Sequence, residues 1–264
     1  MSGAPESFWA ELPLGRGVTL LKHDANGVAA FNKPAGVLSH PNERGEEARA
    51  LLTTRYDLAG EFFEWEAGES EGAGGSRRLW LLNRLDSATS GVILAAADET
   101  LAREIRAQFK RRSIRKVYQA LVFGVPTVPA QFWRDRLAVQ KRAGMIRTGS
   151  GHIPAETQMT LVRRGAGAAA GRALLKLEPH TGRSHQLRVQ CAKRHLPIVG
   201  DATYGDFRRN REFARATGEK RLFLHSLETA FTYAAGGRSF SFSAQAPLPE
   251  AFRGALQSGG QRTS

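Results

Sequence analysis

Short apolar segments separated by polar turns run through most of the chain, and this pattern constrains the fold more than any other feature. Apolar runs bounded by Gly, Pro, Asn or Asp predict strands. Such runs are residues 27–32, 78–82, 91–96, 115–123, 173–177, 222–233 and 239–242. Helices are predicted over 99–110, with Asp98 as the N-cap, and over 184–195. Strands outnumber helices, so the sequence predicts an α+β fold with a mixed, largely antiparallel central sheet and flanking helices rather than a doubly wound fold.

Two runs of small residues, 69–76 and 165–171, resemble nucleotide-binding loops only superficially. The first lacks the Gly-Lys-Ser/Thr ending of a P-loop. The second has the wrong glycine spacing for a dinucleotide fingerprint and leads into a strand. Both are therefore predicted to be exposed hairpin loops.

The chain is strongly basic: 38 Lys and Arg against 25 Asp and Glu give a net charge of +13 and a pI near 10.6. This excess favours a polyanionic partner, either nucleic acid or an anionic membrane surface. No apolar run approaches the roughly 18 residues of a membrane span, and the N-terminus lacks the features of a signal peptide. A single cysteine, Cys191, excludes an internal disulfide and a multi-cysteine zinc site. We expect a cytoplasmic, nucleic-acid-binding protein with no membrane partner.

A polar turn, residues 83–91 (NRLDSATSG), separates two apolar strands. It places Arg84 and Asp86 at a sheet edge, while Leu85 between them points into the core and fixes their direction. Ser, Thr and Gly around an Asp also suit an ordinary surface turn, because such residues hydrogen-bond their own backbone. The segment alone is thus either a site for a functional carboxylate or a surface turn.

A second polar segment, residues 178–188 (EPHTGRSHQLR), spans the end of a strand and the start of a helix. His185 and Arg188 are three residues apart and share a helix face. Cations at a helix start oppose the helix dipole, which is easier to explain if an anion binds there. A metal site is disfavoured, because His180 and His185 are five apart and no HExxH is present.

A basic run lies at a predicted helix-to-strand junction. It contains Lys110, Arg111, Arg112, Arg115 and Lys116. Such a run is either solvated surface or a phosphate-binding segment. Tyr118 follows on the same strand, where a lone tyrosine is more often part of a core than of a catalytic site.

The order of these segments resembles the motif series of RluA-type pseudouridine synthases. The matching motifs are 31–37 (FNKPAGV), 84–86 (RLD) with 89–91 (TSG), 116–122 (KVYQALV), 180–188 (HTGRSHQLR), and 197–201 (PIVGD) with Tyr204-Gly205. The resemblance covers roughly residues 27–245, and five ordered motifs make coincidence improbable. It implies the family's fold with a central RNA-binding cleft, and cofactor-free isomerisation of uridine to pseudouridine in structured rRNA or tRNA.

The resemblance also implies roles for individual residues. Asp86 would be the catalytic nucleophile and Arg188 its ion-pair partner, while Tyr118 would lie against the target base. Arg84 would help displace or replace the flipped nucleotide. The remaining expected substrate-binding residues are Asn83, Arg183, His185, Lys110, Arg111, Arg112, Arg115 and Lys116. Asn83 stands where the family usually has His, and an amide can form hydrogen bonds but cannot carry a proton.

This chemistry requires the residue types that the motifs supply. A carboxylate must attack the sugar or relay a proton, and a fixed cation must keep it ionised. The target nucleotide must be extruded, and the detached uracil must be held by an aromatic or apolar wall. No metal or redox cofactor is expected. A non-catalytic RNA-binding protein is the competing interpretation, and a metal-dependent nuclease is disfavoured because the sequence shows no carboxylate cluster.

The expected organisation is an N-terminal extension over residues 1–25, one catalytic domain over 26–250, and a C-terminal tail over 251–264. Family members often carry an S4 RNA-binding domain before the catalytic domain, and residues 1–25 are too few to form one. We therefore expect a monomer whose catalytic domain recognises RNA by itself.

Overall fold

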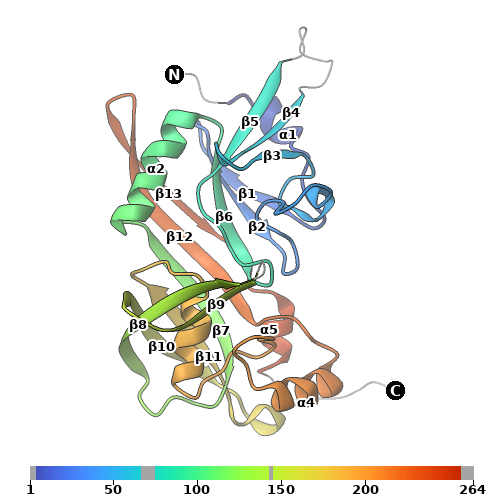
Figure 1. Ribbon diagram of the computed structural model, residues 1–264, viewed down its shortest axis with the longest axis vertical. Helices are drawn as coiled ribbons and strands as arrows, with labels where there is room; N and C mark the ends of the chain where they lie inside the picture. Colours follow the sequence, from blue (N-terminus) through green and yellow to red (C-terminus); the bar gives the residue numbers. More distant parts are fainter. Residues whose placement is uncertain (1–3, 67–74, 143–144, 257–264) are drawn as a thin grey trace. The chain divides into compact units, whose positions relative to one another are not determined.

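The computed structural model describes residues 4–66, 75–142 and 145–256 (Figure 1). The chain divides into two compact units. Unit 1 comprises residues 1–115 and 228–246, and unit 2 comprises residues 116–227 and 247–264. Two of the three divisions fall within strand β7 (Arg115–Phe123) and strand β12 (Leu224–Ala235). Strands dominate both units and helices are few, which confirms the predicted α+β class.

Unit 1 is built on a largely antiparallel sheet. Its strands are β1 (Thr19–His23), β2 (Val28–Lys33), β3 (Arg55–Asp57), β4 (Phe62–Glu66), β5 (Ser76–Leu81), β6 (Ser90–Ala96) and β13 (Arg238–Gln245), together with most of β12. The strand order is β3-β4-β5-β6-β12, with β2 pairing both β1 and β6, and β13 pairing β12. The strands predicted over 27–32, 78–82 and 91–96 are thus confirmed with small shifts at their ends.

Helix α2 (Glu99–Arg111) covers β5 and β6 of unit 1 (Figure 1). It begins as predicted, because the Asp98 carboxylate accepts a hydrogen bond from the Leu101 N–H at 2.7 Å. Leu101 and Ile105 are buried in a core with Val92 and Leu94 of β6. The helix ends at Arg111, and the C-cap residue Arg112 has a left-handed φ of 63°.

Residues 4–25 belong to unit 1 and contribute to its core and its sheet. Helix α1 (Glu6–Ala10) buries Phe8 and Trp9, and β1 pairs with β2. A 3-10 turn, η1 (Glu47–Arg49), lies further along the same unit. In unit 2, the predicted C-terminal tail begins within helix α5 (Glu250–Gly254), whose Phe252 is fully buried. Residues 257–264 lie outside the described residues.

Unit 2 has a second antiparallel array. Its strands follow the order β7-β11-β10-β8-β9, with β8 (Ala130–Arg142), β9 (Met145–Ser150), β10 (Ile153–Arg164) and β11 (Arg172–Pro179). The sequence predicts β7 and β11 but not β8, β9 or β10. Between Ala155 and Met159 of β10 every second residue is buried, but Ala155 and Thr157 occupy two of these three positions. Small or polar inward residues hide the two-residue period that marks a strand.

Three helices complete unit 2. Helix α3 (Gln186–Lys193) is shorter than the predicted 184–195, because His185 adopts a left-handed φ of 54° at its start. Leu187 and Cys191 are buried as predicted. Helix α4 (Phe207–Thr217) was not predicted; the Asp206 side chain caps its first turn by accepting from the Arg209 N–H.

The two predicted hairpin loops have different outcomes. Residues 165–171 connect β10 to β11 through a 3-10 turn, η3 (Gly167–Ala169), so the second loop is confirmed. The first falls mostly on residues 67–74, which lie outside the described residues. Among the described residues, no helix is both long and apolar enough to cross a membrane.

Candidate active-site residues

The turn that carries Asp86 is fixed by hydrogen bonds on both sides of the carboxylate. Buried Ser39 binds the backbone of Leu85 twice: its Oγ donates to the Leu85 carbonyl at 2.8 Å and accepts from the Leu85 N–H at 3.0 Å. The Asp86 carbonyl in turn accepts from the Thr89 N–H at 2.9 Å. Asp86 itself is half-buried. The hydrogen bonds at Leu85 and Thr89 fix the backbone from which its side chain extends.

Lys33 holds the same turn in place through hydrogen bonds from its side chain. Its side chain is fully buried. Its Nζ donates to the carbonyls of Pro34 at 3.0 Å, Val37 at 2.6 Å and Ser87 at 3.1 Å. The Gly36 N–H also donates to the Ser87 carbonyl, at 2.8 Å. The 31–37 motif therefore holds the residue next to Asp86, a role that sequence analysis did not assign.

Lys33→Met should destabilise unit 1 by about 3 kcal/mol or more, because three inward-facing carbonyls lose a charged donor and each costs on the order of 1–3 kcal/mol when unsatisfied. The measurement is urea unfolding followed by tryptophan fluorescence. Lys22→Met is the matched control, since Lys22 is exposed and should change stability by less than about 1 kcal/mol. Equal losses in the two variants would contradict the clamp.

Asn83 has a structural role in unit 1. Its Oδ1 accepts from the Leu94 N–H at 2.8 Å, directly after the backbone bond from the Leu82 N–H to the Leu94 carbonyl. The amide oxygen thus takes the place of a main-chain carbonyl and extends the ladder between β5 and β6. Contact of Asn83 with substrate stays a prediction, as does that of Arg84, whose side chain is exposed.

In unit 2, Arg188 forms a buried ion pair that the sequence analysis missed. Its Nε and one terminal nitrogen donate to the two carboxylate oxygens of Asp201, each at 2.8 Å, in the bidentate geometry that suits a guanidinium. The Arg188 and Asp201 side chains are 8% and 1% exposed. Asp201 also accepts from the N–H groups of Thr203 and Tyr204. Asp201 was noted as part of a motif, but nothing in the sequence assigned it a partner.

The ionisation of Asp201 is controlled by this pairing. Burial by itself would raise the pKa of the carboxyl, but the hydrogen bonds and charge of Arg188, together with the N–H groups of Tyr204 and Thr203, outweigh burial and hold the pKa below its usual value. The Arg188 guanidinium also lies 5.1 Å from the centroid of the Tyr204 ring. The predicted pairing of Arg188 with Asp86 stays a prediction.

His185 is held by the same loop of unit 2. The Tyr204 hydroxyl lies 2.8 Å from His185 Nδ1 and accepts from the Thr148 N–H at 2.8 Å. The start of α3 is fixed further by Gln186, whose Oε1 accepts from the Thr181 hydroxyl and the Arg183 N–H. The 180–188 motif is therefore held in place by several side-chain hydrogen bonds.

Strand β7 brings Lys116 to this motif. A Cβ atom placed on Gly182 would lie 3.8 Å from the Lys116 Nζ, so the ammonium group adjoins the loop that precedes α3. Tyr118 is half-buried on the same strand and pairs with Leu177 of β11. Unit 2 thus gathers three predicted residues, Lys116, His185 and Arg188, around one segment.

The rest of the basic run belongs to unit 1. Lys110, Arg111 and Arg112 are exposed at the end of α2. Arg111 lies 3.7 Å from a Glu104 oxygen, and Arg115 pairs with Glu228. Two of these cations therefore already have acidic partners within the unit.

Neither a cysteine nor a metal cluster marks a second chemical site in the described part of the chain. Burial raises the pKa of the Cys191 thiol and keeps it protonated. Within residues 4–66, 75–142 and 145–256, no three His, Cys, Asp or Glu side chains are grouped to hold a metal ion.

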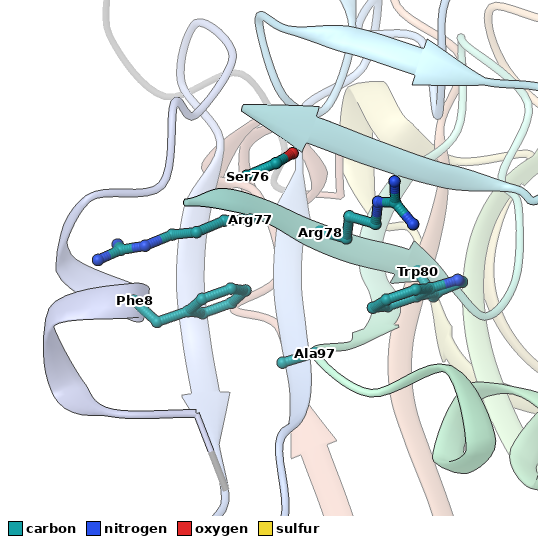
Figure 2. A pocket seen from close by; sticks show the side chains of 6 residues that line it. All are labelled: Phe8, Ser76, Arg77, Arg78, Trp80 and Ala97. Carbon is teal, nitrogen blue, oxygen red and sulfur yellow. The ribbon is translucent and has the colours of Figure 1, made fainter. Parts of the chain in front are cut away.

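One hollow of about 410 Å³ lies beside α1 and β5 (Figure 2). Its lining consists of Phe8, Ser76, Arg77, Arg78, Trp80 and Ala97. Arg77 pairs with Glu11 at 2.9 Å and Arg78 with Glu64 at 2.8 Å. Because both cations are neutralised locally, the hollow offers little attraction for a phosphate group.

The chain is similar in sequence and in fold to RNA pseudouridine synthases. Residues 27–193 match the family model described as RNA pseudouridylate synthase. A "tRNA pseudouridine synthase C" of Yersinia pestis is 31% identical over 230 residues, which cover 83% of this chain and 82% of that protein. The "Dual-specificity RNA pseudouridine synthase RluA" of Escherichia coli K12 is 35% identical over 228 residues, covering 83% and 89%. The solved structure "Human RNA Pseudouridylate Synthase Domain Containing 1" shares the fold with a TM-score of 0.64 at 20% identity, covering 94% of this chain and 91% of that one.

The α+β fold is that of the pseudouridylate synthases. The chain belongs to the RNA pseudouridylate synthase family, in its RluA-type branch, and is an RNA-modifying isomerase.

Proposed function

We propose that this enzyme converts specific uridines of tRNA or rRNA to pseudouridine, with Asp86 as the nucleophile and without a cofactor. The observation that carries the proposal is the double clamp on the Asp86 turn by Ser39 and Lys33. A carboxylate whose backbone is fixed on both sides is preorganised for attack on a positioned substrate. The printed names of the relatives, which include a tRNA and a dual-specificity RNA enzyme, support the substrate class.

The reaction requires that the N1–C1′ bond of uridine breaks, that the uracil turns, and that C5 bonds to C1′. C5 then loses its proton and N1 gains one, so that the product is an isomer of the substrate. In the proposed route the Asp86 carboxylate attacks the sugar or takes up its proton while the uracil is detached. The target nucleotide must first leave its stack. We propose that Arg84, exposed on the same turn, takes the place that the extruded nucleotide vacates.

Unit 2 supplies the remaining proposed groups. Arg188 would stabilise the charge of the attacking carboxylate. Its guanidinium has five N–H donors, and two of them bind Asp201. Tyr118 would lie against the uracil ring. The proposed RNA contacts also include Asn83, Arg183, His185, Lys110, Arg111, Arg112, Arg115 and Lys116.

Purified enzyme should form pseudouridine in unmodified tRNA or rRNA transcripts in the presence of EDTA, with no nucleotide or reductant added. The transcripts are folded beforehand, and pseudouridine is mapped at single-nucleotide resolution. Heat-inactivated enzyme is the control. RNA binding without product on any transcript would favour a non-catalytic RNA-binding protein and contradict the proposal.

A further inference from the structure

The positive charge of the protein is concentrated in unit 2. Its residues, 116–227 and 247–264, include 22 Lys and Arg against 8 Asp and Glu. Residues 1–115 and 228–246 of unit 1 include 16 Lys and Arg against 17 Asp and Glu. The net positive charge that attracts a polyanion therefore lies in unit 2, although the densest basic run in the sequence lies mostly in unit 1.

Helix α4 of unit 2 presents a row of arginines. Arg208, Arg211 and Arg215 are exposed and lie at positions i, i+3 and i+7, so they share one face. Phe213, on the opposite face, is buried and packs edge-on against Phe223, with ring centroids 5.4 Å apart. The helix is thus amphipathic, with its apolar face used by the fold and its arginine face turned to solvent.

The arginines of α4 differ in what they bind. Arg208 pairs with Glu212 at 2.8 Å. Arg209 turns toward the protein, where it donates to the Gly171 carbonyl and lies over the Phe123 ring. Arg211 and Arg215 make neither an ion pair nor a side-chain hydrogen bond with any other residue in 4–66, 75–142 and 145–256. Two adjacent cations on one helix face are therefore not neutralised by the described part of the chain.

Helix α4 is fastened to the loop that holds Arg188. Asn210 accepts from the Gly200 N–H at 2.8 Å and donates to the Asp201 carbonyl at 3.0 Å. Asp201 in turn binds the Arg188 guanidinium. A ligand held on the outer face of α4 would accordingly be held at a fixed distance from Arg188.

We propose that the outer face of α4, centred on Arg211 and Arg215, binds the phosphate backbone of the substrate RNA beside the target nucleotide. This inference rests on the proposed function for the identity of its ligand. Phe207, which is 54% exposed, stands one turn before Arg211 and offers a ring on which an unpaired base can stack.

The chemistry of α4 favours RNA over an anionic membrane. A helix that lies in a membrane interface inserts its apolar face into the lipid. The apolar face of α4 is occupied by the core of unit 2, and Phe207 is the one large apolar side chain of this helix that is strongly exposed. The face suits a ligand that is recognised by charge and stacking.

The test compares RNA affinity across a range of KCl concentrations for full-length variants, using a pool of transcribed tRNA as the probe. Arg211→Gln with Arg215→Gln should raise Kd about tenfold at 100 mM salt and lower the slope of log K against log salt by about two. Phe207→Ala should raise Kd with little change of slope, because stacking releases no counterions. The single-turnover rate at saturating enzyme should stay within about twofold of wild type in both.

Arg16→Gln with Arg238→Gln is the matched control, since it removes the same charge from exposed positions of unit 1 and should leave Kd within about twofold. The Kd of Arg111→Gln with Arg112→Gln, at the end of α2, is measured in the same way to test whether the basic run contacts RNA. An unchanged slope in the α4 variant, or an equal loss in the control, would overturn the inference. The inference would also be overturned if the α4 variant lost binding to phosphatidylserine vesicles while its RNA affinity was retained. If the α4 variant shows the expected loss of affinity but wild type forms no pseudouridine, RNA binding by the outer face of α4 is supported and the proposed function is contradicted.

Discussion

Asp86→Asn should lower the rate of pseudouridine formation by at least about 10⁴-fold, while the protein stays folded and binds RNA with near wild-type affinity. The substitution keeps the size of the side chain but removes the charge and the nucleophilic oxygen. The fold should tolerate it, because Ser39, Lys33 and Thr89 hold this turn through backbone atoms that the substitution leaves in place. The rate is measured under single-turnover conditions, so that weaker binding is not mistaken for slower chemistry.

Glu43→Gln is a suitable control for this experiment, since it removes one exposed carboxylate from the same unit. It should leave the rate within about twofold of wild type. If Asp86→Asn retains more than a few per cent of the wild-type rate, another group performs the attack. If the variant loses activity only because it unfolds, its circular dichroism and unfolding midpoint will show this directly.

The sequence predicted those elements whose local signals agree with their tertiary surroundings. Helix α2 was predicted with its cap, because Asp98 and the apolar residues at four-residue spacing are sufficient to define an amphipathic helix. Strand β6 was predicted because all seven of its residues are buried and apolar or small. Helix α4 was missed because four arginines interrupt its apolar pattern and only Phe213 of its residues is buried.

The candidate site could be predicted as a set of residues but not as a set of contacts. The ordered motifs pointed to Asp86, Tyr118 and Arg188. The hydrogen bonds of Lys33 could not be predicted from the sequence. Its acceptor at Ser87 is 54 residues away and is a backbone carbonyl, which every residue type carries. The pairing of Arg188 with Asp201 likewise depends on how the 197–205 loop folds back onto α3, which no periodicity encodes.

The Arg188–Asp201 pair should make a large contribution to stability that depends on pH. Because the pKa of folded Asp201 lies below its ordinary value of 3.8, the pair stabilises the native state fully above that value. The stabilisation is lost as the pH falls through the folded-state pKa. Unfolding measured between pH 7 and pH 2 should therefore show a larger loss of stability below about pH 4 in the wild type than in Asp201→Asn.

At pH 7, Asp201→Asn should cost about 3–5 kcal/mol, because a buried guanidinium loses its anionic partner. The Asn oxygen can still accept from the N–H groups of Thr203 and Tyr204, so these two hydrogen bonds to the loop backbone are retained. Adding Arg188→Met removes the buried charge, and the double variant should recover a substantial part of the lost stability. It should not recover activity, because the proposed role of Arg188 requires a cation beside the reacting carboxylate. A double variant that regained both stability and turnover would show that Arg188 serves the fold and not the reaction.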